Sequence, residues 1–148
     1  MQRSAEKNTS GQASGIRMLH LIMLGAGVLV ALVFHLMTRL RGPILIPDSA
    51  TPVMAYAFAG IAMTAVAFAV LLLRPRIPER GSSEAVNDYW SNGAVRQRAL
   101  IMWVVCENAA IIAGLGYLLT GHLAALITAG LALVALAWFG PSRIAGES

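Results

Sequence analysis

The sequence predicts an all-α integral membrane protein, a four-helix transmembrane bundle of two antiparallel hairpins. Two observations support this fold class. First, 57% of the 148 residues are hydrophobic, only 12% are charged, and the mean hydropathy is +0.70, which is typical of membrane proteins. Second, the hydrophobic residues form four long runs separated by proline, glycine and basic residues. Each run is long enough for a helix to cross a hydrocarbon core of about 30 Å.

The first half of the chain begins with a polar segment, residues 1–15, which we expect to be disordered. The membrane domain covers residues 16–140, and its first span is residues 18–38. A basic residue before an apolar run is also typical of a signal peptide, but this run is long and no Ala-x-Ala site follows it. We therefore expect an uncleaved helix, which ends before the three prolines of residues 39–52.

The second span, residues 53–73, contains no charged residue. Small side chains recur four residues apart, as at Ala55 and Ala59, and this spacing lets another helix approach closely. The hydrophilic loop at residues 74–98 follows. We expect it to lie on the membrane surface, with Tyr89 and Trp90 at the lipid interface.

The third and fourth spans form the second hairpin. They cover residues 99–119 and 123–139, and a turn of three residues joins them. Glycine and proline at positions 140 and 141 end the fourth span, and residues 141–148 form a short polar tail.

The basic residues predict the orientation of the bundle. Nine of them flank the side that holds both termini and the middle loop, and two, Arg39 and Arg41, flank the other side. Because basic flanks stay in the cytoplasm, we expect both termini there and place the protein in the cytoplasmic (inner) membrane. The nine residues are Arg3, Lys7, Arg17, Arg74, Arg76, Arg80, Arg96, Arg98 and Arg143.

Glu107 is the one carboxylic acid within a predicted span. It lies near the middle of residues 99–119, where a charged side chain costs several kcal/mol and the neutral acid is favoured. The residue is therefore a candidate for proton or ion handling, with Asn108 and Tyr117 as polar neighbours along the same helix. An equally weighted alternative is that Glu107 joins two helices through a hydrogen bond.

Two histidines, His35 and His122, are predicted to lie at a similar depth near the outer ends of the first and fourth spans. Imidazoles on different helices can ligate haem or a metal ion. The favoured alternative is hydrogen bonding at the interface, because the pair lies at the rim of the membrane. We therefore expect no cofactor and no metal.

Other functional classes lack sequence support. Cys106 is the single cysteine, which excludes an internal disulfide, and we expect it to be a small buried side chain. There is no glycine-rich phosphate loop and no Gly-x-Ser-x-Gly motif, so we expect no enzymatic activity. The basic residues flank apolar runs, which argues for topology and against a nucleic-acid partner. No soluble substrate is indicated.

One segment resembles a known family. Arg96 and Gln97, the central Glu107 and the sequence Gly114-Leu115-Gly116-Tyr117 are similar to the carboxyl-bearing helix of the c subunit, or proteolipid, of rotary ATP synthases. This resemblance covers residues 96–119 and implies that Glu107 binds and releases a proton or sodium ion in a ring. As a whole, the chain resembles the small uncharacterised four-span membrane proteins of bacteria, a likeness that implies no activity.

Two functional hypotheses follow. The first is a non-enzymatic accessory or structural subunit, which packs in the lipid bilayer with copies of itself or within a larger membrane complex. The second is a proton- or ion-coupled transport component that uses Glu107. Replacing Glu107 with Gln separates them, because the amide keeps the hydrogen bonding and cannot ionise.

Overall fold

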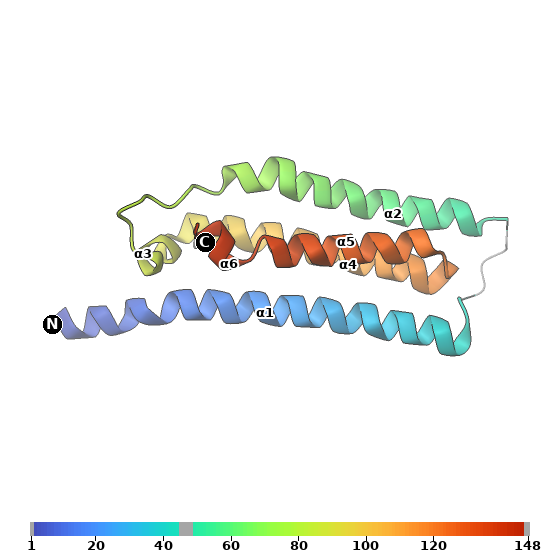
Figure 1. Cartoon of the computed structure of the whole chain (residues 1–148), viewed down its shortest axis with the longest axis horizontal. Coiled ribbons are helices and arrows are strands. Elements are labelled where there is room, and N and C mark those ends of the chain that lie inside the picture. Colours follow the sequence, from blue (N-terminus) through green and yellow to red (C-terminus); the bar gives the residue numbers. More distant parts are fainter. Residues whose placement is uncertain (1, 45–48, 147–148) are drawn as a thin grey trace.

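The computed structural model describes residues 2–44 and 49–146 and confirms a helical bundle, with no strand in these ranges (Figure 1). Four long helices form the bundle, and two short helices cover one end. The long helices are α1 (Gln2–Arg41), α2 (Thr51–Phe68), α4 (Gly93–Thr120) and α5 (Leu123–Trp138), and the short ones are α3 (Val86–Ser91) and α6 (Pro141–Ile144).

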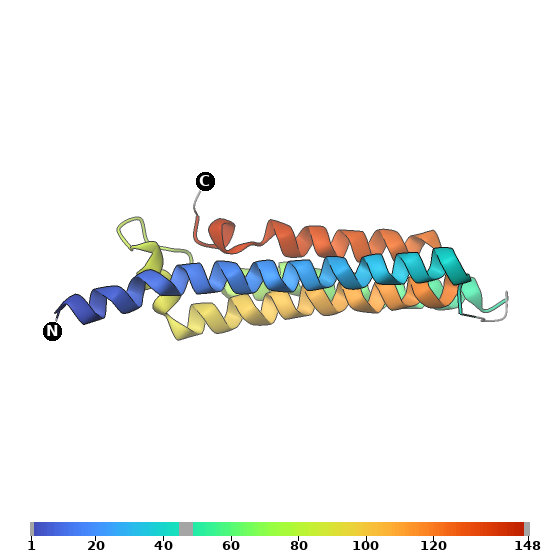
Figure 2. The ribbon, with the colours of Figure 1, turned by 90° about the horizontal axis from the view of Figure 1, so that it is seen from below.

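Helix α4 is the centre of the bundle. It packs against α5, α2 and α1, whereas α1 and α2 lie on opposite sides of the α4–α5 hairpin (Figures 1 and 2). One end of the bundle holds the N-terminal end of α1, the short helix α3 and the C-terminal helix α6. The chain runs along the bundle four times, and so it finishes at the end where it began. We call this the terminal end.

Three segments are long and apolar enough to cross a membrane: Gly11–Arg41, Thr51–Arg76 and Gly93–Thr120. Helix α5 has 16 residues and is therefore about 24 Å long, shorter than a typical hydrocarbon core. As at the end of any α-helix, its last carbonyls have no partner within the helix and need one from another part of the chain.

Helix α1 extends further than the sequence predicted. We expected disorder over residues 1–15, whereas helix begins at Gln2. Ala13 and Ile16 are buried in the same apolar cluster as Tyr89 and Trp90 of α3, so contacts between helices that are distant in sequence support this part of α1. The prediction considered composition alone and missed these contacts.

Helix α2 and the turns that continue it end close to residue 73, the predicted end of the second span. The α-helix gives way to a π-helical turn, Ala69–Leu73, and then to a 3-10 turn, Arg74–Arg76, before the chain becomes extended at Ile77. Pro75 lies within the last turn. Because proline removes a backbone donor and restricts the preceding residue, the helix cannot continue.

Alanines make the contact between α2, α4 and α5. Ala55, Ala59 and Ala62 of α2 are buried, as the small-residue spacing predicted for the first two. The last of them belongs to a cluster of six buried alanines from the three helices, which lets the backbones approach closely. The six are Ala62, Ala109, Ala110, Ala113, Ala129 and Ala132.

Two glycines of α4 each accept an aromatic ring from a neighbouring helix. A Cβ on Gly114 would lie 2.9 Å from Cδ2 of Phe34 in α1, and a Cβ on Gly116 would lie 2.5 Å from Cβ of Phe58 in α2. These distances are too short for any side chain. The glycines of the Gly-Leu-Gly-Tyr sequence therefore fix how closely α1 and α2 pack on α4.

The terminal end is a folded cap. Tyr89 and Trp90 were expected at the lipid interface, but both side chains are buried. The Tyr89 hydroxyl donates a hydrogen bond of 2.7 Å to the Pro78 carbonyl, and burial raises the pKa of this phenol. Arg80 donates to the carbonyls of Ala145 and Glu84, which links the middle loop to the segment after α6.

Candidate functional site

Glu107 lies halfway along α4 and is half-buried. Gly27 of α1 lies beside it, and a Cβ on this glycine would lie 3.9 Å from Glu107 Cγ and 2.9 Å from Leu133 Cδ2 of α5. The carboxylate therefore lies where α1, α4 and α5 meet, beside a position with no side chain. In the ranges that the structure describes, no hydrogen bond or ion pair reaches it.

The surroundings of the carboxylate bear on one of the two alternatives for Glu107. Gly27 of α1 lies beside Glu107, whereas Gly114, two turns further along α4, accepts the Phe34 ring. The hydrogen bond between helices, one of the two alternatives for Glu107, is not formed by any described residue of this chain.

Asn108 lies on a different face of α4 and is exposed. Its Nδ2 donates a hydrogen bond of 2.9 Å to the Val104 carbonyl of its own helix, and so it does not join α4 to a neighbour. Ile101, Val104 and Leu115 are also exposed on α4. Asn108 is consequently a polar group on an otherwise apolar outer surface, midway along the helix.

Tyr117 is paired with His35. The side chain of Tyr117 is buried, and its ring stacks on His35 of α1 with centroids 5.8 Å apart and planes 15° apart. Nδ1 of His35 is buried and has no hydrogen-bond partner within the described residues. No hydrogen bond in this part of the chain connects Glu107 to Tyr117, which lies about 15 Å further along α4.

His122 belongs to a separate contact. It caps α5, because its Nδ1 accepts a hydrogen bond of 3.3 Å from the N–H of Ala124, and its ring meets Tyr56 of α2 edge-on at 5.3 Å. Over the described ranges no ring contact or hydrogen bond joins it to His35 or Tyr117. The two histidines that we considered as a haem or metal pair thus contact different tyrosines, and no group of three potential metal ligands occurs among the described residues.

Sequence reasoning missed the polar site at the other end of α5. His20 Nε2 donates a hydrogen bond of 2.9 Å to the Leu136 carbonyl, and Trp103 Nε1 donates one of 2.7 Å to the Phe139 carbonyl. The two rings meet edge-on at 4.8 Å. They satisfy the last carbonyls of the short helix α5, and its length of 16 residues is the signal that could have predicted this.

Gly140 and Cys106 also lie in this region. Gly140 lies against His20, since a Cβ there would be 3.3 Å from the Ala137 carbonyl oxygen and 3.4 Å from His20 Cε1. Cys106 is a free, fully buried thiol in the apolar cluster that also holds Trp103, as the sequence predicted. Neither residue contacts Glu107 in any recorded interaction, and both support packing.

The chain was compared with protein-family models, with curated proteins and with solved structures, and nothing matched in any of the three comparisons.

Proposed function

We propose that this protein is a non-enzymatic accessory or structural subunit of the cytoplasmic membrane, with both termini in the cytoplasm. The observation that carries this proposal is Asn108, a side-chain amide exposed on the apolar outer face of α4. The Nδ2 bond to Val104 leaves the amide oxygen of Asn108 without a partner among the described residues, and model helices associate by about 1–2 kcal/mol through a side-chain amide bond between them. Asn108 therefore marks the surface where a partner helix packs.

The distribution of charge supports the orientation. Arg74, Arg76, Arg80 and Arg143 all lie at the terminal end, near the folded cap, whereas Arg39 and Arg41 end α1 at the opposite end. Because basic flanks remain in the cytoplasm, the terminal end faces the cytoplasm. A partner that packs on α4 would meet the cap on that side.

We expect Asn108→Leu to weaken the association of this protein in the membrane by about tenfold, because the side-chain bond to the partner is lost. The measurement is the mass of the complexes that contain the tagged protein, by native electrophoresis after mild extraction from its own membranes. Thr64→Val is the matched control, since Thr64 is an exposed polar residue of α2 that bonds to its own helix. Unchanged complexes in Asn108→Leu, or a wild type that is monomeric, would contradict the proposal.

A second candidate function is proton- or ion-coupled transport through Glu107. It is favoured by the carboxylate that has no partner within the described part of the chain and lies beside Gly27 in α1. A membrane-buried carboxylic acid without an internal partner is typical of a site that takes up and releases a cation.

Carbodiimide labelling tests this second candidate, because dicyclohexylcarbodiimide attacks protonated carboxyls in apolar surroundings. If Glu107 exchanges protons, its labelling, followed by mass spectrometry of the protein in lipid, fades as the pH rises through the physiological range. Glu107→Gln is the control that identifies the labelled residue, and it should assemble normally. Absence of labelling at every pH means that the carboxyl is sealed in an interface, and transport is then excluded.

A further inference from the structure

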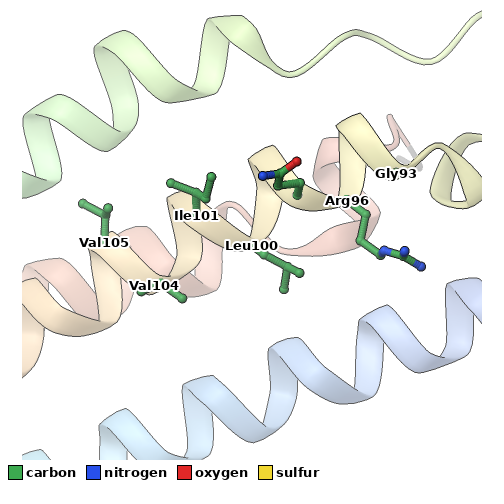
Figure 3. Close-up of a pocket in the computed structure, with 7 residues that line it drawn as sticks. Gly93, Arg96, Leu100, Ile101, Val104 and Val105 are labelled. Carbon is green, nitrogen blue, oxygen red and sulfur yellow. The ribbon is translucent and has the colours of Figure 1, made fainter.

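A groove of about 470 Å³ runs along the outer face of α4 at its terminal end (Figure 3). Its apolar part is lined by Leu100, Ile101, Val104 and Val105. In Figure 3, Ile101 and Val105 point toward α2, whereas Leu100 and Val104 point toward α1, so the groove follows the strip of α4 that lies between these two helices. The volume lies in the range of about 300–1,000 Å³ that is usual for small-molecule sites.

The polar mouth of the groove is formed by Gly93, Arg96 and Gln97, at the start of α4. The side chain of Arg96 is exposed, and its guanidinium has no hydrogen bond or ion pair within the described residues. By contrast, Arg98 donates a bond of 2.6 Å to the Arg76 carbonyl. The guanidinium of Arg96 is therefore available to a ligand, and a helix N-terminus adds partial positive charge beside it.

We infer that this groove binds one anionic phospholipid of the cytoplasmic leaflet. The phosphate lies on Arg96 and the Gln97 amide, and one acyl chain lies along the four apolar side chains. The inference uses the membrane orientation proposed above, but it does not depend on a partner subunit.

The dimensions and charge of the groove agree with this ligand. From Arg96 to Val105 is nine residues, or about 14 Å along the helix, which is close to half of a hydrocarbon core of about 30 Å. One leaflet thus matches the length of the groove. Guanidinium and phosphate form charge-assisted hydrogen bonds, and anionic lipids are concentrated on the cytoplasmic side. The groove ends one turn before Asn108, so the lipid lies on the cytoplasmic side of the proposed partner contact.

Native mass spectrometry of the full chain, released from nanodiscs that contain phosphatidylglycerol and phosphatidylcholine with identical acyl chains, tests the inference. We expect one retained phosphatidylglycerol, and we expect Arg96→Gln to weaken its binding on the order of tenfold, as is typical of a lost charged hydrogen bond. Arg98→Gln and Arg41→Gln make the same change in charge outside the groove and should retain the lipid. Arg41 lies at the opposite end of α1, so this control does not depend on the cap.

A second variant tests the acyl chain. Ile101→Phe narrows the groove at an exposed position, and it should reduce the retained phosphatidylglycerol severalfold while Arg96 remains in place. Equal retention of the two lipids would overturn the inference, because the groove would then be a general lipid contact. Competition by free phosphate that is as strong as competition by the lipid would also overturn it, because the groove would then be an anion site. A mass that shows a second polypeptide and no lipid in the wild type would assign the groove to a partner helix and also overturn it.

Discussion

Gly116→Ala is expected to destabilise the bundle, although the same substitution within a helix normally stabilises a protein by up to about 1 kcal/mol. The new Cβ would lie 2.5 Å from Cβ and 2.9 Å from Cγ of Phe58. These atoms cannot move without displacing α2, because they are the base of the side chain and not its flexible end. Overpacking of this kind costs about 1–3 kcal/mol of stability. We expect this loss to appear as a lower midpoint of unfolding in detergent.

Gly130→Ala is the matched control for Gly116→Ala. Gly130 lies in α5, and a Cβ there would meet nothing within 4 Å. This variant should be as stable as the wild type or more stable. In a double-mutant cycle, Phe58→Gly should remove most of the cost of Gly116→Ala, because it deletes the Phe58 Cβ that the new methyl group meets. Equal stability of the two glycine variants would show that α2 packs differently on α4.

Trp103→Ala should produce the largest loss of stability, about 3–5 kcal/mol. The indole is fully buried, contacts His20 and Trp90, and donates its N–H to the Phe139 carbonyl. Its removal leaves a cavity in the cluster at the terminal end and an unpaired carbonyl at the end of α5. The measurement is the free energy of unfolding in mixed micelles, or the temperature of unfolding where the transition is irreversible.

Two further tryptophan variants separate the effect of the lost hydrogen bond from the effect of the lost buried ring. Trp103→Phe keeps much of the ring but loses the N–H, so it should cost about 1–3 kcal/mol through the unpaired carbonyl of Phe139. Trp138→Ala makes the same truncation on an exposed tryptophan, whose ring lies 3.6 Å from the Arg143 guanidinium carbon. It should cost less than about 1 kcal/mol. If the two alanine variants lose equal stability, burial of Trp103 does not support the bundle as we describe.

The candidate site shows how far sequence reasoning reaches in such a chain. A carboxylate within a long apolar run is visible in sequence, and Glu107 does lie halfway along its helix. The neighbours of Glu107 were not predictable. Gly27, which lies beside it, is separated from it by 80 residues, and the pairing of Tyr117 with His35 likewise joins two helices that are distant in sequence. A membrane helix is apolar on all sides, so its periodicity does not reveal which face packs inward.

The sequence by itself determined the apolar part of each of the four long helices and which helix carries the half-buried acid. Helix formation in an apolar run is local, because every backbone polar group must find its partner within its own helix, and prolines and glycines end the runs. Only the tertiary structure decided which faces meet. These helices are apolar on most sides, so apolar burial alone does not select a face. Packing follows the fit of Gly116 to Phe58 and the bond from His20 to the end of α5.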